Sequence, residues 1–203
     1  TEDDSDGAAI AVYGRDTGGN NILQPPVATA DAQVIVGDMN ANNLSDGGFI
    51  DTSFRGGAGD DVIHINNGDF NDIDGGGGLF DTISIDSGGM IDFSSFMRED
   101  IQRIEVLHLN TGQSMTLTLQ NVFSMMQTSD DGTLTITASS GNTLTIDDMG
   151  TGNVTAASAT QVGAALGADS VVDNGGASWG FYFGGNVLTI DSSLFVSNSV
   201  NIV

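Results

Sequence analysis

The nine residues Gly56-Gly57-Ala58-Gly59-Asp60-Asp61-Val62-Ile63-His64 decide how this chain is expected to fold. They match the pattern G-G-x-G-x-D-x-U-x, where U is a large apolar residue, at every specified position. Glycine tolerates positive φ angles, so the first four residues allow a tight turn whose carbonyl oxygens point inward. Ile63 then begins a short strand that packs into a core. The stretch therefore predicts a glycine turn followed by a short buried strand.

The chemistry of the turn favours a metal ion. Asp61 adds a charged oxygen to the carbonyl oxygens, and Ca²⁺ is a hard cation that takes roughly 6–8 oxygen ligands at about 2.3–2.6 Å. Calcium is the cofactor we expect. A Gly- and Asp-rich loop that binds no metal is the alternative.

Three neighbouring segments repeat this scheme less perfectly. Residues 74–83 show the order glycine turn, aspartate, apolar strand with one residue out of register, residues 67–73 are a degenerate copy, and residues 46–52 are a shortened one. Residues 31–81 hold ten of the chain's aspartates. We therefore predict a calcium-binding segment over residues 31–90.

The charge of the chain limits its partners. It has 27 acidic residues against four basic ones, for a net charge of −23. Such a surface repels nucleic acid and anionic lipid, and bound divalent cations would relieve its self-repulsion. A halophile-like acidic surface is the alternative, but only three of the acidic residues are glutamates, whereas aspartate suits tight turns.

Other features of the composition fit a secreted protein. The chain has no cysteine, so a secreted domain needs a stabilising element other than disulfides, and calcium can supply one. The absence of cysteine is also compatible with a cytoplasmic protein. No run of about 18 apolar residues predicts a membrane span. No signal peptide is visible, and we expect the chain to be part of a longer protein.

The pattern along the chain predicts a mainly β fold in three parts. Residues 1–30 are expected to be a linker with an edge strand, residues 31–90 the Gly/Asp-rich segment, and residues 91–203 a β-rich segment packed with it as one domain. Strands are predicted at 34–36, 62–65, 82–85 and 199–203, and short helices at 120–127 and 157–166. Residues 93–101 predict a short helix or turn.

Two-residue alternation marks the β-rich segment, as at Leu134 and Ile136 or Leu144 and Ile146. Turn signals at residues 130–132 and 140–142 are expected to join these strands as hairpins. The expected fold is therefore short β-roll-like Gly/Asp turns joined to an antiparallel β-sheet or sandwich, with one or two short helices.

The nonapeptide resembles the RTX (repeats-in-toxin) calcium motif of bacterial proteins exported by type I secretion. The segments that follow are similar to non-repetitive modules of large RTX adhesins and biofilm surface proteins. These include a strand of the form I-E-x-[IL]-x-L at residues 104–109, a hairpin at 134–136 and the closing residues 182–191. The chain departs from a long β-roll because it has one good nonapeptide and only damaged copies.

The resemblance implies a set of calcium ligands. In the first turn these are the carbonyls of Gly56, Ala58 and Asp60 with the Asp61 carboxylate. The second turn would contribute Gly75, Gly77 and Asp81, with Asp72 or Asp74 as further candidates.

Catalytic patterns are scarce. His64 and His108 both lie in strand-like segments, no G-x-S-x-G elbow presents a serine, and H-E-x-x-H is absent. A glycosidase-like aspartate pair is the least remote alternative. We expect no enzyme, although an accessory domain of a secreted RTX hydrolase is an alternative.

Two surface patterns leave a binding role open. Residues 179–183 form the densest aromatic cluster, with Trp179 and Tyr182 as candidate contacts to a glycan or peptide, against core packing as the alternative. Thr-x-Thr rows at 116–118, 133–137 and 143–145 suggest a flat or ice-binding surface, although threonine is also common on solvated strands.

Taken together, these patterns predict a calcium-stabilised extracellular module of an RTX-type adhesin. It would be secreted to the bacterial cell surface, contribute to attachment or biofilm formation, and be monomeric beside neighbouring domains of a longer chain. A calcium-dependent glycan- or peptide-binding module is the alternative. Neither nucleic acid nor membrane insertion is expected.

Overall fold

The computed structural model describes residues 10–12, 27–28, 31–86, 89–97, 99–147, 157–196 and 199–202. It is 44% strand and 14% helix, which confirms the mainly β fold class. The rest of the predicted N-terminal linker lies outside the described residues.

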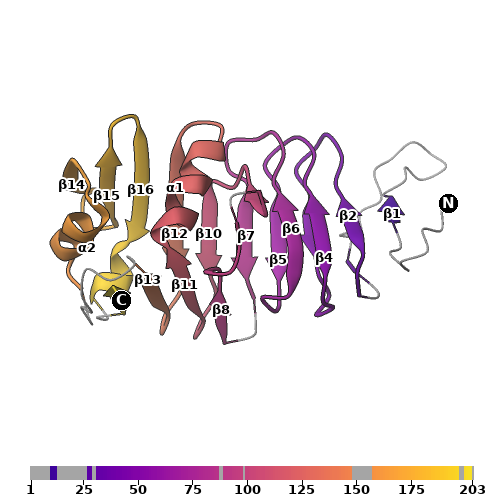
Figure 1. The fold of residues 1–203 in the computed structure, drawn as a ribbon, viewed down its shortest axis with the longest axis horizontal. Helices are drawn as coiled ribbons and strands as arrows, with labels where there is room; N and C mark the ends of the chain where they lie inside the picture. The colour runs from indigo at the N-terminus through magenta and orange to yellow at the C-terminus, as the bar shows by residue number, and fades with distance from the viewer. Residues whose placement is uncertain are drawn as a thin grey trace.

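The strands of the described residues form three sheets in an elongated molecule, with the second sheet running along most of its length (Figure 1). The first sheet has the order β1 (Ile10–Val12), β2 (Val34–Val36), β4 (Thr52–Arg55), β6 (Phe70–Asp74), β9 (Ile101–Gln102). The second has the order β14 (Ser170–Asp173), β15 (Ser178–Phe183), β16 (Asn186–Asp191), β12 (Thr133–Ala138), β10 (Val106–Leu109), β7 (Thr82–Ile85), β5 (Val62–Ile65), β3 (Asn43–Ser45). The third has the order β17 (Val200–Ile202), β13 (Thr143–Asp147), β11 (Ser114–Thr118), β8 (Met90–Asp92).

From β1 to β13, each neighbour within a sheet pairs in parallel and lies one coil further along the chain, which makes this part of the fold a parallel β-solenoid. Ile35 pairs with Phe54, and Phe54 pairs with Ile73, each nineteen residues on. All three side chains are buried, so identical positions of successive coils stack in the core. Successive strands from β2 to β7 alternate between the first and the second sheet, and β8 begins the third sheet.

One hydrophobic cluster runs from Ala28 to Ile202. The Gly/Asp-rich segment and the β-rich segment therefore share a single core.

The predicted antiparallel sheet or sandwich is wrong for most of the β-rich segment. The expected hairpin strands β12 and β13 belong to different sheets, where β12 pairs in parallel with β10 and β16, and β13 with β11 and β17. Alternation of apolar and polar residues fixes which side of a strand is buried, but it does not identify the strand's partner. Among the described residues, the antiparallel ladders are those that join β14, β15 and β16.

The described residues form three helices, where one or two were predicted: α1 (Leu119–Thr128), α2 (Ala159–Leu166) and α3 (Ser192–Val196). Thr118 and Asn121 form a capping box at the start of α1, and Ser158 and Gln161 form another at α2. The first two helices confirm the predictions at 120–127 and 157–166. Described residues between 93 and 100 form turns and no helix.

The predicted C-terminal strand is present as β17, at the edge of the third sheet. The N–H of Ala157 donates to the carbonyl of Val200 at 2.7 Å, on the side that faces away from β13. The outer edge of β17 is therefore partly covered by the chain itself.

Candidate calcium-binding turns

The nonapeptide folds as expected into a glycine turn that leads into β5. Gly57 and Gly59 have φ angles of 109° and 93°, which favour glycine. A Cβ added to Gly56 would lie 1.9 Å from the carbonyl oxygen of Gly75 in the next coil. Glycine at position 56 therefore allows adjacent turns to approach more closely than any side chain would permit.

The structure brings the two predicted calcium turns side by side. Ala58 and Gly77 form an isolated parallel bridge. The N–H of Gly59 donates to the carbonyl of Gly77 at 2.6 Å, and the N–H of Gly77 donates to the carbonyl of Gly57 at 3.0 Å. The second turn, with one residue out of register in sequence, thus stacks on the first in space.

A column of buried carboxylates lies behind these turns. Asp61, Asp81 and Glu105 each directly precede a strand of the second sheet, and their exposed fractions are 0, 1 and 2%. Each accepts a backbone N–H from the preceding coil: Asn42 to Asp61 Oδ1 at 2.7 Å, Asp61 to Asp81 Oδ1 at 2.7 Å, and Asp81 to Glu105 Oε2 at 2.9 Å. Three acidic side chains are therefore stacked in successive coils and buried from solvent.

Burial makes this column electrostatically costly. Loss of hydration is the main reason that the pKa of Asp61 rises to about 7, with the nearby charges of Asp81, Asp38 and Asp60 adding to it. The same cause raises the pKa of Glu105 to about 7 and raises that of Asp81. The backbone hydrogen bonds act in the opposite direction and offset only part of this cost.

Sequence reasoning missed Glu105 as a member of this column. Its signal is its position, because it directly precedes β10 as Asp61 precedes β5 and Asp81 precedes β7. The longer third coil hides the equivalence, because 24 residues separate Asp81 from Glu105 and 20 separate Asp61 from Asp81.

One oxygen of the column is unsatisfied. Asp61 Oδ2 is buried and has no hydrogen-bond partner, and a Cβ on Gly56 would lie 2.4 Å from it. A buried, unpartnered carboxylate oxygen beside a backbone turn fits a hard cation such as Ca²⁺. In the described part of the chain, no group of three or more acidic or histidine side chains converges to hold a metal ion by itself. Backbone carbonyls would have to complete the ligand set.

At the opposite corner of the solenoid, where the strands of the second sheet end, the acidic residues alternate with asparagines. Residues that follow the strands there alternate as Asp46, Asn66, Asp86 and Asn110. The Asn66 side chain donates to Asp46 Oδ1 at 2.6 Å, and the Asn110 side chain donates to Asp86 Oδ1 at 2.7 Å. Amides thus separate the carboxylates at this corner, whereas nothing separates Asp61 from Asp81.

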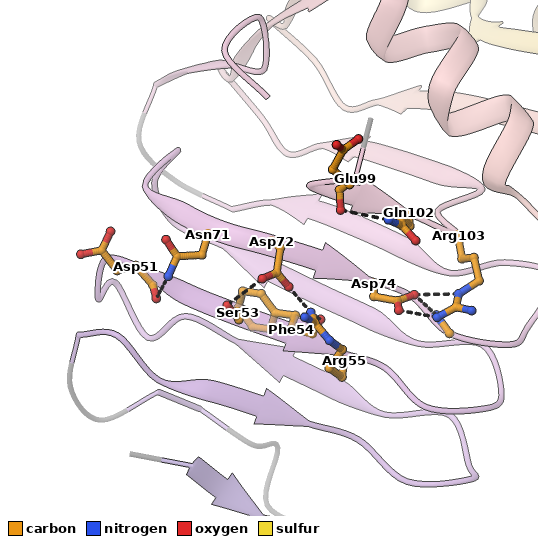
Figure 2. Close-up of polar contacts among 11 residues, drawn as sticks. Asp51, Ser53, Phe54, Arg55, Asn71, Asp72, Asp74, Glu99, Gln102 and Arg103 are labelled. Carbon is orange, nitrogen blue, oxygen red and sulfur yellow. Dashed lines mark hydrogen bonds and ion pairs between the residues drawn. The ribbon is translucent and has the colours of Figure 1, made fainter. Parts of the chain in front are cut away.

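Two of the predicted ligands are engaged elsewhere, on the first sheet (Figure 2). Asp72 accepts from Arg55 and from the Ser53 hydroxyl at 3.1 Å, and Asp74 forms a two-pronged ion pair with Arg103. Their charges are therefore already compensated.

Asp60 lies exposed in the turn. Its Oδ1 accepts the N–H of Leu79 at 2.9 Å, in the next coil.

The hydrogen bonds of the two histidines are to residues other than serine. His64 Nδ1 lies 2.7 Å from Asp86 Oδ2, but its Nε2 faces Asn43, and the Ser84 hydroxyl donates to Asp86 instead of to the histidine. His108 Nδ1 lies 2.8 Å from the Thr137 hydroxyl.

The two aromatic candidates lie on opposite faces of β15. Trp179 is opposite the buried Ile190 and packs edge-on against Phe195 with ring centroids 6.4 Å apart. Tyr182 is opposite the half-buried Val187. Trp179 therefore packs against the core, whereas Tyr182 lies on the other face of the strand.

Comparison with known proteins finds no matching family model, no matching curated protein and no matching solved structure. Among the described residues, no helix has the length and apolar character that crossing a membrane requires.

Proposed function

We propose that this chain is a calcium-stabilised extracellular module of a bacterial RTX-type adhesin, which contributes to cell-surface attachment or biofilm formation. The observation that carries the proposal is the column of Asp61, Asp81 and Glu105, buried in consecutive coils with Asp61 Oδ2 left without a partner. Buried like charges without compensation are strongly unfavourable, so the column needs protons or a cation.

Calcium is the cation that the donors favour. The residues that would hold it are Asp61 with the carbonyls of Gly56, Ala58 and Asp60, and across the coil boundary Asp81 with Gly75 and Gly77. All offer oxygen, which suits a hard cation. When bound, the ion would neutralise the carboxylates and link successive coils.

Calcium dependence fits a secreted protein at the cell surface. Extracellular calcium modules bind with dissociation constants of about 10⁻⁴–10⁻³ M, so they fill outside the cell and stay empty in the cytoplasm. Folding after type I secretion would follow. Calcium at about 100 times its dissociation constant adds ~2.7 kcal/mol to stability, a large share of a total of ~5–15 kcal/mol. Such a module is a spacer or contact domain beside other domains of a long chain, and it carries no reaction of its own.

The test is a thermal melt at pH 7.5 in calcium, in magnesium and in EDTA. We expect a higher Tm in calcium, and a smaller response to magnesium because Mg²⁺ requires a stricter octahedral shell. Equal Tm values in calcium and EDTA would refute the proposal.

A further inference from the structure

At β14, β15 and β16 the second sheet has an outer face, opposite the side chains that pack in the core. Along β15, Phe181 pairs with Leu188 and both are fully buried, whereas Gly180 pairs with Thr189 and Tyr182 with Val187, on the other face. Side chains alternate between the faces of a strand. Tyr182 and Thr189 therefore point away from the core.

The helix contacts with β15 lie on the inner face. Phe123 of α1 packs edge-on against Phe183 with ring centroids 5.2 Å apart, and Phe195 of α3 packs on Trp179. A Cβ on Gly163 of α2 would meet the side chains of Val171 and Phe181. Val172, on the outer face of β14, keeps 42% of its surface exposed.

Glycine at position 180 makes room for the ring of Tyr182. A Cβ there would lie 3.1 Å from Cε2 of Tyr182 and 3.5 Å from its hydroxyl, and 3.4 Å from Nδ2 of Asn174. The edge of the ring and an amide thus share the space that a side chain would fill. An aromatic ring, a phenol hydroxyl and an amide lie together at this point of the surface.

Threonines extend this surface across the neighbouring strands. Thr189 pairs with Thr135, and Val187 with Thr133. Methyl and hydroxyl groups of β16 and β12 therefore lie next to each other on this face, separated by the usual distance between strands of about 4.8 Å. Hydroxyl and amide groups both donate and accept hydrogen bonds, as sugar hydroxyls require. An aromatic ring offers an apolar surface to the C–H groups of a sugar ring.

The charge of the chain restricts the type of sugar. It carries −23 overall and has no lysine, and its described arginines, Arg55 and Arg103, are paired on the first sheet. Asp191, opposite Ser178 on the outer face of β16, adds a negative charge to this face. An acidic polymer would be repelled.

We propose that this outer face, centred on Tyr182 with Thr135 and Thr189, binds a neutral polysaccharide. The site goes beyond the proposed calcium role and does not need the metal. β15 lies five strands from β5 in the sheet order, or roughly 24 Å at the usual strand spacing, so calcium does not bridge protein and sugar here.

The probes are insoluble cellulose, chitin and curdlan in pull-down assays, and soluble mannan and dextran in affinity electrophoresis, with alginate as the acidic polymer. We expect retention by at least one neutral polymer and none by alginate. Tyr182→Ala should weaken binding at least tenfold, whereas Tyr182→Phe should bind within threefold of the unmutated chain. Phe80→Ala, which removes an exposed aromatic ring from a different surface, is the matched control and should bind normally.

No retention by any neutral polymer, unchanged binding by Tyr182→Ala, or binding to alginate alone would overturn the proposal. If Tyr182→Ala fails to fold, the double variant Thr135→Val/Thr189→Val replaces it. This variant keeps the side-chain shape and removes two hydroxyls, so it should weaken binding in the same assays. Performing each assay in a medium where circular dichroism shows the chain folded, with calcium and with EDTA, separates the proposals. If calcium does not raise the Tm but the chain still binds sugar, only the proposed calcium role is refuted.

Discussion

The carboxylate of Asp81 accepts the backbone N–H of Asp61 at 2.7 Å, and both side chains are buried. One acidic residue thus holds the backbone of another that lies one coil earlier. The hydrogen bond fixes the spacing of the coils, but it also brings two like charges together in the core. Calcium binding, proton uptake and coil stacking should therefore be coupled at this point.

Asp61→Asn should separate charge from hydrogen bonding. The amide oxygen can still accept the N–H of Asn42, and Asn42 itself occupies the same position one coil earlier, where its Oδ1 accepts the N–H of Asp38 at 2.7 Å. In EDTA at pH 7.5 we expect Tm to rise by roughly 2–8 °C, because a buried charge is removed. The calcium response should be lost. Asp46→Asn, at the amide-separated corner, is the control and should keep that response.

The fall of stability with rising pH should disappear when calcium is bound. The folded-state pKa values of Asp61 and Glu105 are about 7, above their ordinary values of 3.8 and 4.5, so the folded state binds more protons. In EDTA, stability should therefore be greatest below about pH 4 for these groups, and fall as pH rises to about 7, by on the order of a few kcal/mol. With calcium bound the loss should disappear, since the metal competes with protons. Melts from pH 4 to 8 check this, and a stability that rises with pH in EDTA would contradict it.

Gly56→Ala should be severely destabilising. The added Cβ would lie 1.9 Å from the carbonyl oxygen of Gly75, and backbone cannot yield as a flexible side chain does. We expect a loss of about 3 kcal/mol or more in urea unfolding. Gly77→Ala is the control, because a Cβ there meets nothing within 4 Å and its φ angle is not positive. Its effect should stay within about 1 kcal/mol.

Arg103 combines an ion pair with a left-handed backbone, since its φ angle is 52°. Arg103→Ala and Arg103→Gly both remove the pair with Asp74, but only glycine relieves the backbone. We expect the glycine variant to be more stable than the alanine variant by about 1 kcal/mol. The pair itself is half-exposed and should contribute about 1 kcal/mol or less, decreasing in high salt. Urea melts of both variants at low and high salt give the two quantities.

Trp179→Ala and Tyr182→Ala should differ in stability although the residues are three apart. Trp179 packs against the core and Phe195, so its removal should cost about 2–4 kcal/mol. Tyr182 lies on the outer face, and its removal should cost about 1 kcal/mol or less. Equal losses in urea unfolding would contradict the assignment of the two faces.

Local sequence patterns predicted the elements of this fold well. The strands at 34–36, 62–65 and 82–85 have the bounds that alternation and glycine turns indicated, and the helices at 120–127 and 157–166 differ by a few residues at most. These features depend on short-range physics. Glycine permits the turn conformation, apolar residues mark the buried side of a strand, and Thr118 and Ser158 cap helices through neighbours three residues away.

The tertiary structure decided which elements meet. Nothing local distinguishes a hairpin between β12 and β13 from parallel pairing one coil away, because both bury Leu134 and Leu144 equally well. The same holds for the candidate site. Asp72 and Asp74 look like calcium ligands in the sequence but face arginines in space, whereas Glu105, 24 residues beyond Asp81, joins the buried column. Sequence by itself determined glycine turns, buried strands and an excess of aspartate. Only coil stacking decided which carboxylates lose their water together, because burial and charge repulsion act between residues that are neighbours in space and not in the chain.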